Sequence, residues 1–191
     1  MDALTTALTD QLDRHWRGQA RPRLEGLTDE EYLWEPVAGA WSVRPRESVS
    51  PPTADARVGG GVWLLDDYDP AHAEPDPAPV TTIAWRLAHL TVQVLGSRAA
   101  ALFDGPACSE ETWRYAGSAA EALDQLDTAY AAWTDGVRGL DEPALRRPTG
   151  SPDGPWAERS MLTLVLHVNR EVIHHLSEVA LLRDLRVDRA H

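Results

Sequence analysis

A row of polar side chains inside an apolar helical segment limits what this chain can fold into. Residues 161–182 are rich in Leu, Val and Ile, and among them His167, Glu171 and His175 follow at intervals of four. Because an α-helix turns once in about 3.6 residues, this spacing places the three side chains along one face. Two imidazoles and a carboxylate are costly to bury unless they are paired, hydrogen-bonded or bound to metal. We therefore expect a second segment to face this row.

A second helical segment carries a suitable partner, His89, within the helical pattern of residues 82–103. Helical bundles build metal sites from Glu and His side chains that point inward from facing helices. A catalytic zinc ion commonly has three protein ligands and one open position. The candidate ligand set is therefore His89, Glu171 and His175. His167, one turn before Glu171, is then expected to orient a ligand from outside the set.

The same residues have a plainer interpretation. Pairs of an acid and a His four residues apart are common on helices, so the row can equally be a hydrogen-bonded network or a partly solvated face. Glu178 shares the face of Glu171 and either accepts a hydrogen bond from a ligand or pairs with Arg183 or Arg86. His174 is expected on the polar edge of the helix. From the residues alone, both interpretations stay open.

Four long helical patterns account for most of the chain, and they cover residues 2–20, 82–103, 118–140 and 158–185. Thr28, with Glu31 three residues later, indicates a capping box and a short helix over residues 28–34. Consecutive helices favour a four-helix bundle over any sheet fold. The predicted fold class is therefore all-α, with residues 1–191 forming one domain.

A long crossover, residues 35–80, separates the first two long helices and is rich in Pro, Gly and Asp. Such long loops are uncommon inside a compact domain and are often functional. Because Trp41 and Trp63 need cover, we expect the crossover to fold back over the bundle.

Trp side chains are candidates for a pocket wall, because Trp combines a large apolar area with one N–H donor. The chain has eight Trp and only one Phe. Trp41 and Trp85 are the expected pocket residues, and core packing is the alternative. Along residues 82–103 the helical period assigns five residues to one face, with Gln93 at its margin: Trp85, His89, Gly96, Ala100 and Phe103.

Charge and composition restrict the partners and the compartment. The net charge is −12 and all 18 basic residues are Arg, with no basic stripe, so nucleic acid and anionic lipid are disfavoured as partners. No apolar run approaches the roughly 20 residues that span a bilayer, and residues 1–14 do not resemble a signal peptide. The single cysteine, Cys108, fits a reducing compartment, so we expect a cytoplasmic protein. Cys108 lies in a loop and is not the expected nucleophile.

Three stretches resemble the DinB superfamily, and together they span most of the chain: WEPVAGAWSVRPR, TTIAWRLAHL and LVLHVNREVIHHLSEVALLRDL. The resemblance implies a four-helix bundle that holds a divalent metal ion between its second and fourth helices, and a homodimer. Many members use three His, whereas the implied set here is His89, Glu171 and His175. This set is similar to that of the mycothiol-dependent maleylpyruvate isomerases, which bind zinc. Those isomerases carry a further carboxy-terminal domain, so we expect related thiol chemistry rather than the isomerisation itself.

The leading functional hypothesis is a metal-dependent transferase or isomerase that uses a low-molecular-weight thiol, such as mycothiol, on a small electrophilic substrate. Zinc is the expected ion, and nickel and manganese also suit mixed imidazole and carboxylate ligands. A metal-dependent hydrolase, in which His167 or Glu178 moves the proton, is the second hypothesis. The third is a bundle that binds a metal or small ligand without catalysis.

Overall fold

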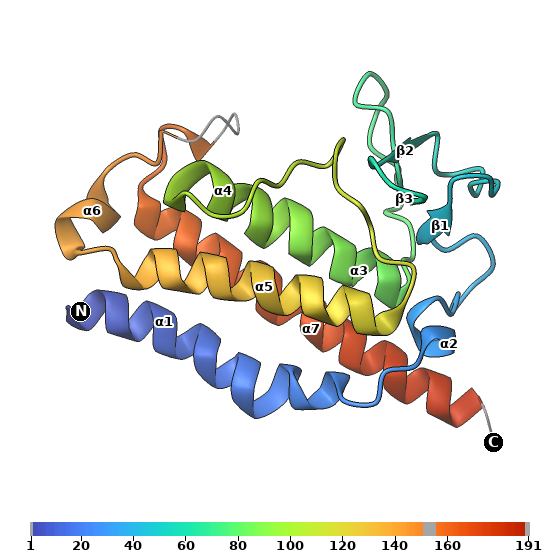
Figure 1. Cartoon of the computed structure of the whole chain (residues 1–191), viewed down its shortest axis with the longest axis horizontal. Coiled ribbons are helices and arrows are strands. Elements are labelled where there is room, and N and C mark those ends of the chain that lie inside the picture. The colour runs from blue at the N-terminus through green and yellow to red at the C-terminus, as the bar shows by residue number, and fades with distance from the viewer. Residues whose placement is uncertain (1, 151–155, 190–191) are drawn as a thin grey trace.

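Four long helical segments run alongside one another in the computed structural model, which describes residues 2–150 and 156–189 (Figure 1). The first segment is α1 (Ala3–His15), continued by the π-helix η1 (Trp16–Ala20). The second comprises α3 (Ile83–His89), the π-helix η3 (Leu90–Gly96) and α4 (Ser97–Phe103). The third is α5 (Ala119–Arg138) and the fourth is α7 (Met161–Arg189). The prediction of a mostly helical fold with these four segments is confirmed.

Short helices link the long segments. They are η2 (Pro22–Leu24), α2 (Asp29–Tyr32) and α6 (Glu142–Arg146). The predicted capping box is present on α2, where Thr28 Oγ1 accepts from the N–H of Glu31 at 3.2 Å and Glu31 Oε2 accepts from the N–H of Thr28 at 3.1 Å. Local polar spacing alone therefore predicted where this short helix begins.

The core lies where the apolar faces of the four segments meet. Leu12 of α1, Leu87 of α3, Leu126 of α5 and Val172 of α7 are all buried in it. Asn169 of α7 is a buried polar exception, and its amide donates to the carbonyl oxygen of Leu8 at 2.9 Å. No helix among the described residues combines the length and apolarity that a membrane span requires.

The crossover contains a small sheet, so the all-α prediction was wrong for this part of the chain. Strands β1 (Val43–Pro45), β2 (Ala56–Val58) and β3 (Trp63–Asp67) form an antiparallel sheet in the order β1-β3-β2. Leu65 of β3 pairs with Val43 on one side and with Val58 on the other. The strands are only three to five residues long. Such short strands give too few alternating positions to stand out among Pro and Gly.

A buried carboxylate and an indole attach this sheet to the bundle. Asp66 of β3 is fully buried, and its Oδ2 accepts from the N–H of Ser42 at 3.0 Å and from Nε of Arg44 at 2.8 Å. The carbonyl oxygen of Asp66 accepts from Nε1 of Trp85, on α3, at 2.9 Å. Trp41 is also buried. The expectation that the crossover folds back over the bundle is confirmed.

The π-helix η3 changes the face predicted for the second long segment. A π-helix has hydrogen bonds from residue i to i+5 and therefore advances side chains differently from an α-helix. Gly96, at its end, faces Cys108, and Phe103 of α4 faces Gly136 of α5. His89 instead faces α7, so the prediction that Gly96 and Phe103 share its face was wrong.

Substituting Gly136 tests the packing of α4 against α5. A Cβ at this position would lie 2.2 Å from Cγ and 2.7 Å from Cβ of Phe103. Gly136→Ala should therefore lower the free energy of unfolding by about 1–3 kcal/mol, measured by urea denaturation. Gly18→Ala is the matched helical control, because a Cβ there meets nothing within 4 Å. It should stabilise by up to about 1 kcal/mol, and equal effects of the two substitutions would contradict this packing.

Candidate metal centre

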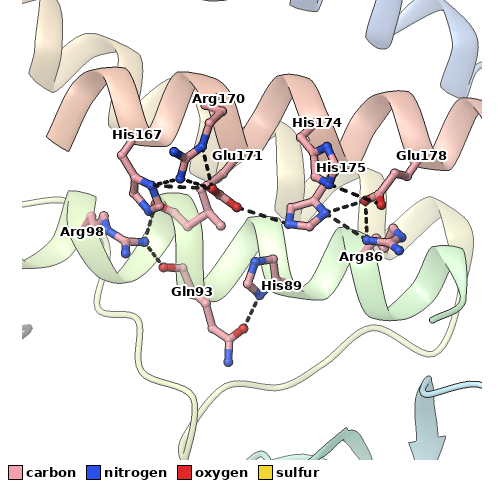
Figure 2. Close-up of polar contacts among 11 residues, drawn as sticks. Arg86, His89, Gln93, Arg98, His167, Arg170, Glu171, His174, His175 and Glu178 are labelled. Atoms are coloured by element: carbon pink, nitrogen blue, oxygen red, sulfur yellow. Dashed lines mark hydrogen bonds and ion pairs between the residues drawn. The ribbon is translucent and has the colours of Figure 1, made fainter. Parts of the chain in front are cut away.

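The three predicted ligands come together between α3 and α7 (Figure 2). His89 ends α3, Glu171 and His175 lie on adjacent turns of α7, and their ligand atoms all lie within 4.8 Å of one another. Nε2 of His175 is 3.4 Å from Oε2 of Glu171. Two atoms that share a tetrahedral zinc ion at 2.0–2.2 Å are about 3.3–3.6 Å apart. The donor set and this separation therefore fit a divalent metal ion.

His89 has one ring nitrogen engaged and the other available. Its Nδ1 donates to Oε1 of Gln93, one turn later in η3. Because an amide oxygen only accepts, this bond places the proton on Nδ1 and leaves the lone pair of Nε2 for a ligand. The ring also stacks on Trp85, with centroids 5.0 Å apart. Burial lowers the pKa of His89 to about 4, so the imidazole is neutral at pH 7.

His175 is held from its other side by an acid. Its Nδ1 lies 2.8 Å from Oε2 of Glu178 and 3.0 Å from Nη1 of Arg86. The carboxylate can only accept and is the nearer partner, so Nδ1 donates to Glu178, while Arg86 pairs with the same carboxylate. Nε2 is then free of its proton and faces Glu171. Burial lowers the pKa of His175, and the bond to Glu178 partly offsets this.

The two carboxylate oxygens of Glu171 have different neighbours. Oε1 accepts from Arg170 at 2.8 Å and lies 3.5 Å from Nδ1 of His167, whereas Oε2 faces His175. Burial raises the pKa of Glu171, but the hydrogen bond from Arg170 and the nearby imidazoles outweigh it, and the pKa lies below its ordinary value. The group thus offers one ionised carboxylate beside neutral imidazoles, the protonation state that metal binding requires.

The other predicted polar residues lie around this group rather than within it. His167 stacks on Trp156 with centroids 4.3 Å apart, and its Nδ1 accepts from Arg170 at 2.8 Å. His174 is exposed, as predicted, with Nε2 3.3 Å from Oε1 of Glu178. His174, His175 and Glu178 form a second possible cluster of ligand atoms. A catalytic role for His167 or Glu178 stays a prediction.

A pocket of about 510 Å³ opens onto His89 and His175. The two predicted pocket residues, Trp41 and Trp85, both line it, and their ring centroids are 6.3 Å apart. Sequence reasoning missed Thr81, which also lines the pocket, and it left Gln93 at the margin. The spacing of four between His89 and Gln93 was the available signal for the latter.

Cys108 belongs neither to the three-residue group nor to the lining of this pocket. Burial raises the pKa of its thiol to about 11. A thiol with so high a pKa stays protonated at neutral pH, and only the thiolate is strongly nucleophilic. These observations agree with the expectation that Cys108 is not the nucleophile.

A model of the DinB superfamily matches residues 48–179, more than half of the chain. The matched region contains His89, Glu171 and His175. Comparisons with curated proteins and with solved structures gave no match.

Titration of His89 gives this site a measurable pH dependence in the metal-free protein. The unfolded His89 has a pKa of about 6.5, whereas the folded value is about 4. The unfolded chain therefore takes up the proton first, and stability is complete above about pH 6.5 and is lost as the pH falls toward 4. His89→Gln should remove up to about 2 kcal/mol of the stability lost between about pH 7.5 and pH 5, measured by urea denaturation at both pH values.

His72 provides a control, because its pKa is shifted in the direction opposite to that of His89. It is exposed, and its hydrogen bond to Asp55 raises its pKa. Its contribution to the free energy of unfolding is therefore present at low pH and is lost as the pH rises through the pKa of the folded state. His72→Gln should not reduce the acid sensitivity of the protein. If His89→Gln also leaves that sensitivity unchanged, the imidazole of His89 is not buried in its neutral form.

Proposed function

Because the chain belongs to the DinB superfamily, we propose that it is a divalent-metal enzyme whose ion is held by His89, Glu171 and His175. The observation that carries this proposal is convergence, because the three ligand atoms lie within 4.8 Å of one another. Each side chain is also fixed at its other polar atom, by Gln93, Arg170 and Glu178 respectively. Such outer partners set the tautomer and orientation of metal ligands.

We propose zinc as the ion, with nickel and manganese as alternatives, since imidazole and carboxylate suit all three. When bound, such an ion would favour the thiolate of a low-molecular-weight thiol over the thiol at neutral pH. In the proposed reaction that sulfur attacks an electrophilic carbon of a small substrate, so that a C–S bond forms, the thiol proton passes to solvent and the bond from that carbon to its leaving group breaks with its electron pair going to the leaving group. Mycothiol is the proposed thiol, on the resemblance to the mycothiol-dependent enzymes.

The residues around the site support such a reaction because they orient the two imidazole ligands and limit the access of water. The Arg86–Glu178 pair keeps His175 in place, and Gln93 does the same for His89. Trp85 lies against His89, so an indole covers one side of the ligand group. Because water competes with sulfur as a nucleophile, restricted access to the reacting carbon favours thiol transfer.

Hydrolysis is the less supported chemistry, because it needs a base beside the bound water. Glu178, one candidate, is engaged by both His175 and Arg86. His167, the other candidate, accepts from Arg170 and stacks on Trp156. Both are therefore committed to holding neighbouring side chains.

Metal content tests the ligand set. Protein purified without a histidine tag should hold close to one ion per chain by elemental analysis. His89→Ala should lower the affinity at least about tenfold, because it removes one of three ligands. His174→Ala is the matched control, since this exposed His belongs only to the outer cluster. A wild-type protein that stays empty when offered zinc, nickel and manganese would contradict the proposal, as would loss of metal in His174→Ala alone.

Activity tests the reaction class. Metal-loaded protein should conjugate mycothiol to members of a panel of small electrophiles, and chelation should abolish the rate. Glu178→Gln should lower metal affinity or rate about 10–100-fold, because an amide is a weaker acceptor for Nδ1 of His175. Turnover of esters or amides without thiol would point to the hydrolase instead. The transferase proposal fails if metal produces no rate with any member of the panel.

A further inference from the structure

Two neighbouring threonines lead into α3, and their backbone is fixed by Trp41. The N–H of Trp41 donates to the carbonyl oxygen of Val80 at 2.9 Å, and the N–H of Thr82 donates to that of Trp41 at 2.8 Å. Thr81 lies between these two bonds, in a parallel bridge with Trp41. In such an extended segment successive side chains point to opposite sides. Thr81 and Thr82 thus present their hydroxyls to different surroundings.

The two hydroxyls differ in their partners. Oγ1 of Thr82 caps α3 by accepting from the N–H of Trp85 at 3.2 Å, and it donates to Oγ of Ser42 at 3.0 Å. Thr81 is only 4% exposed and lines the pocket beside His89, yet its Oγ1 has no hydrogen-bond partner among the described residues. A buried hydroxyl without a partner costs free energy. A ligand in the pocket is the partner that would offset this cost.

The indole walls of the pocket have no donor to offer. Nε1 of Trp41 donates to Oγ1 of Thr53 at 3.1 Å, and Nε1 of Trp85 donates to the carbonyl oxygen of Asp66 at 2.9 Å. What these walls present to a ligand is therefore apolar and aromatic surface. Flat apolar groups pack well against such rings, and cations are attracted to them.

The charges that line the pocket are mostly negative. Arg86 already pairs with Glu178, which leaves Asp67 and Glu74 as acidic groups of the lining. Both accept hydrogen bonds from Tyr68, Asp67 from its N–H at 2.8 Å and Glu74 from its hydroxyl at 3.0 Å, which does not cancel their charge. An anion entering here would meet like charges at short range.

We propose that this pocket binds a small molecule that is uncharged or cationic, with a polar group hydrogen-bonded to Thr81 Oγ1 and a flat apolar body against Trp41 and Trp85. This ligand class is the substrate class of the site proposed above, and its catalytic meaning rests on that proposed function. All the groups that would contact this ligand are protein side chains, from the Thr81 hydroxyl and the two indole rings to the carboxylates of Asp67 and Glu74. The ligand can therefore bind whether or not a metal ion is present.

Stability separates a binding role for Thr81 from a structural one. Thr81→Val keeps the shape and removes the unpartnered hydroxyl, so the melting temperature should rise by about 2–4 °C. Thr82→Val is the matched control, because it removes the cap of α3 and should lower the melting temperature. A lower melting temperature in Thr81→Val would show that the hydroxyl serves the fold, and would overturn the proposal.

Binding of three matched probes to zinc-free protein tests the ligand class. Benzylamine and benzyl alcohol should bind at least about tenfold more tightly than benzoate, measured by ligand-observed NMR. Thr81→Val should weaken benzyl alcohol about 2–10-fold, the worth of one neutral hydrogen bond. Combined Asp67→Asn and Glu74→Gln should reduce the discrimination against benzoate. The proposal is overturned if benzoate binds as tightly as benzylamine, if Thr81→Val changes nothing, or if no probe binds.

Metal uptake by the same protein, measured separately after zinc is offered, keeps the two proposals distinct. Probes that bind in the expected order to a protein that never takes up metal would support the ligand class and refute the metal enzyme. A protein that binds one ion per chain but binds benzoate most tightly would support the metal enzyme and refute the proposed ligand class.

Discussion

The contact between α3 and α7 depends on satisfying polar side chains inside an apolar interface. Two imidazoles and a carboxylate would destabilise such a contact if their polar atoms had no partners. Each instead has a protein partner on the side away from the other two, so that the remaining atoms converge. The Arg86–Glu178 pair joins the two helices directly and orients His175 at the same time. One set of contacts therefore both holds the helices together and prepares a ligand group.

The crossover completes the site by bringing a second layer over α3. Asp66 and Trp85 join the sheet to the helix, and Trp41 fixes the segment that precedes α3. Thr81 is presented to the pocket as a consequence of this anchoring. The bundle thus supplies the candidate ligands, whereas the crossover and Trp85 of α3 together supply the walls of the pocket. A change in the crossover can alter what binds without moving the ligands.

The sequence predicted the parts that depend on local spacing. The interval of four on α7 and the capping box of α2 act within one or two helical turns, and both are present in the structure. The short strands escaped prediction because three to five residues give too few alternating positions, and the π-helix η3 escaped it because an α-helical period was assumed throughout the segment. Gln93 was left at the margin of the predicted face, although its spacing of four from His89 indicated the contact that the structure shows. Thr81 could not be recognised from the sequence, because only the folded structure shows that its buried hydroxyl has no hydrogen-bond partner among the described residues.

Whether one ion joins His89, Glu171 and His175 is the point on which the functional account depends. Anomalous diffraction from crystals of the zinc-loaded protein tests it most directly. The account predicts a single strong peak about 2.0–2.2 Å from Nε2 of His89, Oε2 of Glu171 and Nε2 of His175. A peak bound instead by His174 and Glu178, or no peak between α3 and α7 in zinc-soaked crystals, would contradict it.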